Sequence, residues 1–159
     1  MARQKLLLDT NIVIDFLNER DPFYQKARLL MLCGRAGEFD LWISSSQFSD
    51  LLYILSEGGR RSELARVTKQ LRGLRTFVQV HPLSSEEIDI VLSSPWQDPE
   101  DQLLAEAALR LRADAIISRD AEGLKDSLVP VFDCDQFFAK LEHEGVIYEA
   151  IDEWTAPEC

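Results

Sequence analysis

The chain has 159 residues, 46% of them hydrophobic and 28% charged, which is typical of one soluble globular domain and excludes a disordered or fibrous protein. Its three cysteines, Cys33, Cys134 and Cys159, are widely spaced and match no disulfide framework or zinc site, which indicates reduced thiols in the cytoplasm. The formal net charge of −11 argues against strong non-specific binding to nucleic acid, because that binding depends on Lys and Arg.

No targeting signal or membrane segment is expected. The apolar run near the start of the chain stops at Asp9 and is too short for a signal peptide. No stretch approaches the roughly 20 apolar residues that a membrane helix needs. The sequence therefore predicts a cytoplasmic protein with no membrane partner, comprising one domain over residues 1–144 and an acidic tail over 145–159.

Hydrophobic spacing predicts strands that alternate with helices along the whole domain. Short apolar runs predict strands at residues 5–8, 41–43, 77–80, 115–117 and 129–132. Apolar residues at helical spacing predict helices at 11–17, 23–35, 62–74, 86–92 and 136–144, one after the serines at 44–46 that reaches 55, and a strong one from residue 99. This alternation predicts an α/β fold, a Rossmann-like parallel sheet flanked by helices on both faces.

Polar residues mark several expected helix starts. Thr10 is expected to cap the helix at 11–17, and Asp21 the helix that Pro22 would begin. Ser84 and Glu87 have the spacing of a capping box. Asp98 before Pro99 is best explained as another N-cap.

Four aspartates lie where a parallel sheet places its functional site. In such a sheet, ligands bind beyond the carboxyl ends of the strands. Asp9 follows the first strand directly, and Asp120 follows the strand at 115–117 after two residues. Asp50 and Asp101 lie near the beginnings of helices that follow short loops. Oxygen-rich sites of this kind suit Mg²⁺ or Mn²⁺, so the four acids predict a divalent-metal site.

The motifs of other enzyme classes are not found in this sequence. A phosphatase of the haloacid-dehalogenase class needs an acid at the position of Asn11, and a response-regulator receiver needs a lysine at the position of Asp133. The chain has neither a Gly-x-Ser-x-Gly elbow nor a glycine-rich phosphate loop.

A basic segment offers a candidate contact for nucleic acid. Arg66, Lys69 and Arg72 share one face of the helix expected at 62–74. If this helix flanks the acidic site, these side chains can hold phosphates. The other interpretation is a solvated helix face.

Three segments resemble the motifs of PIN-domain nucleases. Residues 6–15, Leu-Leu-Leu-Asp-Thr-Asn-Ile-Val-Ile-Asp, resemble the family's opening motif. Residues 98–108, beginning Asp-Pro-Glu-Asp, resemble the acidic start of its later catalytic helix, and Ile-Ile-Ser-Arg-Asp at 116–120 resembles its fourth motif. Residues 44–55 occupy the place of the second motif. Within the family, the chain is most similar to small bacterial VapC-like proteins.

The resemblance implies a role for each matching residue. Asp9, Asp101 and Asp120 would be catalytic acids that bind Mg²⁺ or Mn²⁺. Asp50 would complete the cluster, although it stands where the family usually has Glu. Asn11 and Ser44 match supporting polar positions, and Asp98 is a further supporting candidate.

The resemblance also implies an activity and partners. The expected activity is metal-dependent hydrolysis of RNA by an endoribonuclease that acts as the toxin of a toxin–antitoxin pair, with an antitoxin protein as partner and a homodimer as a common assembly. A PIN-fold module that binds RNA or protein with little catalysis remains the alternative, favoured by Asp50 and by the acidic net charge.

Overall fold

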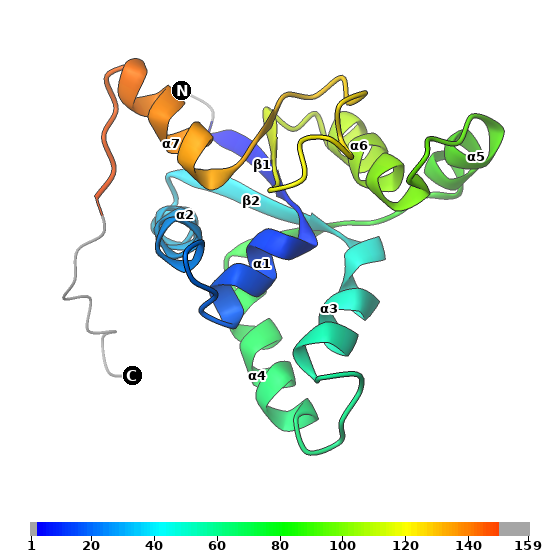
Figure 1. Ribbon diagram of the computed structural model, residues 1–159, viewed down its shortest axis with the longest axis horizontal. Coiled ribbons are helices and arrows are strands. Elements are labelled where there is room, and N and C mark those ends of the chain that lie inside the picture. Colours follow the sequence, from blue (N-terminus) through cyan, green and yellow to red (C-terminus); the bar gives the residue numbers. More distant parts are fainter. Residues whose placement is uncertain (1–2, 150–159) are drawn as a thin grey trace.

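A five-stranded parallel sheet forms the centre of the computed structural model, which describes residues 3–149 (Figure 1). The strands are β1 (Gln4–Leu8), β2 (Phe39–Ser44), β3 (Val78–His81), β4 (Ala115–Ile117) and β5 (Val131–Phe132), in the order β3-β2-β1-β4-β5. The chain begins in the middle of the sheet, adds strands on one side and then continues on the other. The strand order therefore reverses at β1, next to β4.

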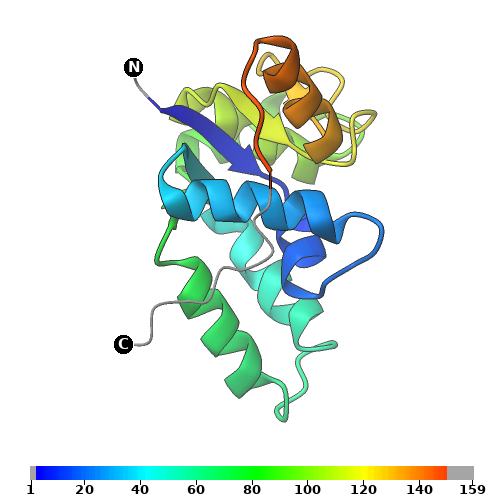
Figure 2. The same ribbon diagram turned by 90° about the vertical axis from the view of Figure 1, so that its left-hand side faces the viewer.

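Helices cover both faces of this sheet, as the sequence predicts. They are α1 (Thr10–Leu17), α2 (Tyr24–Ala36), α3 (Phe48–Leu55), α4 (Leu64–Leu74), α5 (Ser85–Ser93), α6 (Pro99–Leu111) and α7 (Cys134–His143), with a short 3₁₀ helix η1 (Ser45–Gln47). Figure 2 shows α2 lying across one face of the sheet. No helix within residues 3–149 is long and apolar enough to span a membrane.

Successive side chains of a strand point to opposite faces of the sheet and so form two hydrophobic layers. In β1, Leu6 and Leu8 join the larger core formed with α1, α2, α3, α4 and α7, whereas Leu7 points to the layer under α6. All three leucines are fully buried. A strand buried on both faces is expected to be continuously apolar, which is why β1 shows no polar alternation.

Two predicted caps are wrong. Asp9, not Thr10, is the N-cap of α1, because Asp9 keeps the extended backbone of β1 while Thr10 is already helical. Asp21 does not cap α2: the N–H groups of Phe23 and Tyr24 bond to the carbonyl of Arg20 instead. The Asp21-Pro22 peptide bond is cis and lies in the turn before the helix.

Other boundaries differ by a few residues. The last strand begins at Val131 rather than 129, since Pro130 has no N–H to donate to the sheet. The last helix begins at Cys134, where Asp133 and Gln136 form a capping box. Ser84 and Glu87 form the predicted capping box of α5.

The predicted acidic tail mostly lies outside the described residues. Within them, the chain after α7 returns toward α2 (Figure 2). Tyr148 packs against Phe39 and Phe138 and donates a hydrogen bond to Glu38, so the chain still contacts the domain at this point.

Gly34 allows α2 to approach β2 closely, and its replacement tests this packing. A Cβ at Gly34 would overlap Leu41, which is fully buried and cannot move aside. We expect Gly34→Ala to lower the free energy of unfolding by about 1–3 kcal/mol in urea denaturation. Gly73→Ala in α4 is the matched control, because nothing lies within 4 Å of its Cβ. The control should gain up to about 1 kcal/mol from helix propensity, and a similar loss in both variants would contradict the prediction.

Candidate metal centre

Asp9 lies between β1 and α1, and both oxygens of its carboxylate accept hydrogen bonds. Oδ1 accepts from the backbone N–H of Thr10 at 2.6 Å. Oδ2 accepts from Ser118 Oγ at 2.6 Å and from Asn11 Nδ2 at 3.1 Å. These contacts hold the carboxylate in one orientation at the carboxyl edge of the sheet.

Ser118 connects Asp9 to Asp120. The strands β1 and β4 are neighbours in the sheet, with Leu8 paired with Ile117, so Asp9 and the turn that carries Asp120 lie side by side. Ser118 Oγ donates to Asp9 and accepts from the backbone N–H of Asp120 at 2.9 Å. One hydroxyl thus places two carboxylates, and the sequence analysis did not identify it as a supporting residue.

The carboxylates of Asp101 and Asp120 both lie beside Gly123. A Cβ at Gly123 would overlap Asp101 Oδ2 and lie 2.8 Å from Asp120 Oδ2, so the absent side chain leaves room for both carboxylates. The N–H of Gly123 donates to Asp120 Oδ1 at 2.9 Å.

Asp98 caps α6, accepting from the N–H groups of Glu100 and Asp101 at 2.9 and 3.4 Å. Asp98 therefore acts on the first turn of α6, which carries Asp101.

An open pocket of about 200 Å³ joins Asp9 and Asp101 to Asp50. Glu100, from the first turn of α6, also lines it and interacts electrostatically with Asp50. Sequence reasoning missed Glu100, although the acidic run at 98–101 was the available signal. The lining residues are Asp9, Thr10, Ser46, Gln47, Asp50, Glu100, Asp101, Leu103 and Leu104.

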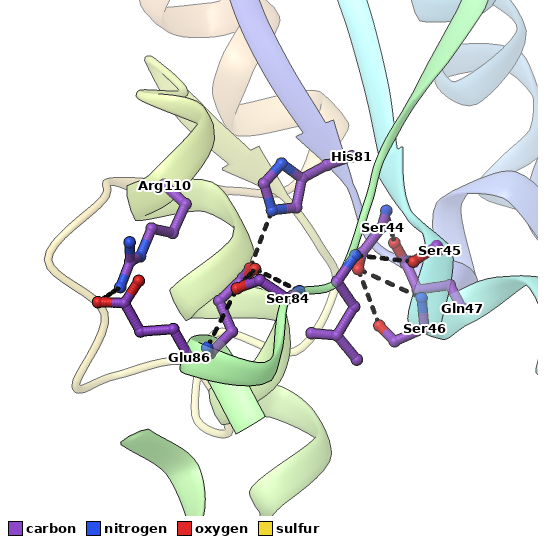
Figure 3. Close-up of polar contacts among 10 residues, drawn as sticks. Ser44, Ser45, Ser46, Gln47, His81, Ser84, Glu86 and Arg110 are labelled. Atoms are coloured by element: carbon purple, nitrogen blue, oxygen red, sulfur yellow. Dashed lines mark hydrogen bonds and ion pairs between the residues drawn. The ribbon is translucent and has the colours of Figure 1, made fainter. Parts of the chain in front are cut away.

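Ser44 and Gln47 shape the wall of the pocket that carries Asp50. Gln47 Oε1 accepts from the N–H of Ser44 at 2.7 Å, and Ser44 caps η1 (Figure 3). Gln47 Nε2 donates to the carbonyl of Leu8 at 2.9 Å and to Thr10 Oγ1 at 3.1 Å. Ser44 thus holds the turn before α3 and has no hydrogen bond to an acid within the described residues. Gln47 connects this turn to the end of β1.

Figure 3 also shows His81 and Ser84, which belong to a second polar group. Buried Glu87 accepts hydrogen bonds from His81, Ser84 Oγ and the N–H of Ser84. Leu83 N–H donates to Ser45 Oγ at 2.9 Å. These contacts join the carboxyl ends of β2 and β3 to α5 and do not involve the acids of the pocket.

Burial, with the charges of neighbouring acids, raises the pKa of three carboxyl groups. Burial raises the pKa of Asp9 above its ordinary value, and the hydrogen bond from Ser118 opposes this shift. Partial burial, followed by the charges of Asp98, Asp120 and Asp9, raises the pKa of Asp101 to about 6. Desolvation and Asp50 raise the pKa of Glu100. At Asp9, Glu100 and Asp101 the surroundings therefore favour the protonated form of the carboxyl group.

The donor set fits a divalent cation. No described lysine, arginine or histidine lines the pocket, and the charge of Arg119, which lies outside the lining, only partly offsets the raised pKa of Asp9. Within residues 3–149, no three acidic side chains lie close enough together to form a ready-made metal site. Mg²⁺ is usually held by one or two carboxylates and several waters, so it does not need such a preformed group.

The predicted RNA-contact residues lie on α4, which contributes no residue to this pocket. In Figure 1, α3 stands between α4 and the beginning of α6. Arg66 bonds to Glu63, to Gln70 and to the carbonyl of Leu55, where it joins α4 to the end of α3. Lys69 and Arg72 are exposed.

A family model described as the PIN domain matches residues 5–122. The chain belongs to the PIN-domain family. This placement agrees with the three motifs and with the parallel sheet whose strand ends carry the acids. No curated protein matches the chain in sequence.

Solved structures show the same fold for this PIN domain. VapBC2 from Rickettsia felis, bound to a promoter DNA fragment, superposes with TM-score 0.60 at 16% identity, covering 82% of this chain and 98% of that one. DNA-bound VapBC from Salmonella typhimurium gives 0.59 at 16%, with the same coverage. FitAcB from Neisseria gonorrhoeae gives 0.61 at 15%, covering 81% and 97%.

Removal of the charge at Asp101 should stabilise the metal-free protein. Because the pKa of Asp101 is raised to about 6, the folded state retains this proton more readily than the unfolded chain does. That stabilisation is present at pH 4 and is lost as the pH rises through 6. In chelator at pH 7.5, we expect Asp101→Asn to unfold at higher urea, with a gain of about 1 kcal/mol after allowance for solvent screening. The gain should shrink toward pH 4, and a constant gain at every pH would contradict this explanation.

Gly123→Ala should weaken cation binding without unfolding the protein. The backbone of Gly123 is not in the left-handed region, so alanine is tolerated there, but its Cβ displaces the Asp101 carboxylate. We expect the Kd for Mn²⁺, measured by electron paramagnetic resonance, to rise by about tenfold or more. The melting temperature in chelator should change little, and an unchanged Kd would show that Asp101 is not needed for the cation.

Proposed function

We propose that this PIN domain is a divalent-metal-dependent endoribonuclease. The supporting observation is the convergence of Asp9, Asp50, Glu100, Asp101 and Asp120, from four parts of the chain, around one edge of the sheet. Clustered like charges without a counter-ion repel one another, so a bound cation would stabilise this arrangement. It is the donor set that Mg²⁺ and Mn²⁺ prefer.

A bound Mg²⁺ or Mn²⁺ would supply a water of lowered pKa and would neutralise charge on the phosphate. The chain's own residues orient the reaction. Asp9 is held on both oxygens and is the best-positioned ligand. Asp101 and Asp120 would provide the second side of the cation site, and Asp50 and Glu100 the opposite wall.

The choice of RNA as substrate rests on the resemblance to VapC-like proteins. Lys69 and Arg72 remain candidates for contacts with more distant phosphates, because both are exposed. Arg66 is a weaker candidate, since its guanidinium already makes three hydrogen bonds within the protein.

We further propose that the protein is the toxin of a toxin–antitoxin pair in the cytoplasm. The similar structures are VapBC and FitAB complexes, and this chain covers almost the full length of the matched chains. A small antitoxin protein would be its partner. A homodimer is the proposed assembly.

Two observations favour a second function, a PIN-fold module that binds RNA with little catalysis. The acids form no preassembled group of three within residues 3–149, and Asp50 is one methylene shorter than the glutamate usual at this position. The two functions share a fold and differ in whether bound RNA is cut.

Cleavage of a single-stranded RNA panel tests the proposal. We expect cutting with Mg²⁺ or Mn²⁺, none with chelator, and a loss of at least about 100-fold for Asp9→Asn, because the amide removes a ligand charge. Asparagine caps helices as well as aspartate, so α1 should persist. Asp89→Asn, an exposed acid on α5, is the control and should cut normally. RNA that binds but stays intact would favour the binding module, and if the protein bound neither RNA nor metal, that result would falsify both.

A further inference from the structure

Arg119 lies between Ser118 and Asp120 in sequence, but its side chain leaves the acidic site and contacts α1. Nε donates to Asp15 Oδ2 at 2.7 Å and Nη2 donates to Asp15 Oδ1 at 3.1 Å. This is the two-pronged geometry of an arginine and a carboxylate, which fixes orientation as well as distance. The pair joins the turn after β4 to the second half of α1.

Asp15 is fully buried, and the proposed chemistry does not use it. A buried carboxylate is costly unless it is paired and hydrogen-bonded. Arg20 is also near, with Nη1 4.0 Å from Oδ1, but it is too distant for a hydrogen bond. Phe23 covers the other side of the pair, its ring centroid 4.0 Å from the Arg119 guanidinium carbon. The aromatic face keeps water from one side of the ion pair and adds a cation–π contact.

The same turn and the same helix also form the acidic site. On α1, Asn11 accepts a long hydrogen bond from the N–H of Arg119 (3.4 Å) and donates to Asp9. On the turn, Ser118 donates to Asp9 and accepts from the N–H of Asp120. The turn is therefore attached to α1 at two places, by the site network at the first residues of the helix and by the ion pair further along it.

We propose that Asp15 and Arg119 are positioning residues of the metal centre, which rests on the function proposed above. The ion pair fixes the turn against α1, so that Ser118 stays within reach of Asp9 and the Asp120 carboxylate faces Asp101. Without this second attachment, the turn can rotate about the Ser118 contact. Neither Asp15 nor Arg119 touches the cation or the RNA.

Arg119→Lys tests the geometry of the pair with the charge retained. Lysine keeps Asp15 neutralised but lacks the planar fork, so the turn loses its fixed orientation. We expect a protein that is folded in chelator, binds Mn²⁺ about tenfold more weakly and has a lower kcat for RNA. The N–H groups of Asp120 and Thr10 should exchange with deuterium faster in the metal-free protein. Arg20→Lys is the matched control, since it alters the other arginine beside Asp15 and should leave all of these readouts unchanged.

A second variant separates positioning from folding. Asp15→Asn with Arg119→Gln removes both charges together and leaves no unpaired buried charge, so it should fold even if a single change does not. Exchange at Asp120 and Thr10 should again rise, and Mn²⁺ affinity should fall as in Arg119→Lys. Wild-type Mn²⁺ affinity and exchange in both variants would overturn the inference. If the wild type binds no Mn²⁺, the proposed function fails, and exchange in chelator still decides the positioning role.

Discussion

The hydrogen bond from Ser118 Oγ to Asp9 Oδ2 joins residues that are 109 positions apart in sequence. It forms only because β4 pairs with β1 in parallel and ends beside it, with Leu8 opposite Ile117. A shift of one residue would turn Ser118 to the other face of the sheet. The apolar alternation that buries Leu6, Leu7 and Leu8 on opposite faces therefore also determines whether the acids meet. The strand register that packs the core therefore also determines the geometry of the site.

The site gathers negative charge that the fold must tolerate before any cation binds. Helix ends supply part of the compensation. Asp9 caps α1, while Asp50 lies in the first turn of α3 and Glu100 and Asp101 in the first turn of α6. The N-terminus of a helix carries partial positive charge and free N–H groups, which favour carboxylates. Compensation is incomplete, as the raised pKa of Asp101 shows. The remaining repulsion is what a divalent ion would relieve.

Sequence patterns predicted the fold class and the placing of Asp9 and Asp120, because strand ends in a parallel sheet share one edge. Glu100 was missed since an acid in a first helical turn is already explained by the helix dipole, and no local pattern shows that α6 begins opposite α3. Gln47 had a usable signal, the Ser-x-x-Gln spacing of a capping box. Asp15 and Arg119 both fall within segments that resemble PIN motifs, but they are 104 positions apart and nothing in either segment indicates that the two side chains pair. Asp9 and Thr10 are adjacent and both residue types cap helices, so the sequence alone does not distinguish them, and only the backbone conformation identifies Asp9 as the cap.

The positions of the acids at helix N-termini have a practical consequence for work with inactive variants. Such helix ends are natural sites for phosphate, and here carboxylates occupy them. Replacement of these carboxylates by amides removes the anions that repel substrate, while the dipoles of α1, α3 and α6 remain. An Asn or Gln variant would then hold a phosphodiester more tightly than the metal-free wild type does. Under the proposed function, such variants are therefore suited to trap the strand that the active form would cut, and so to identify its target.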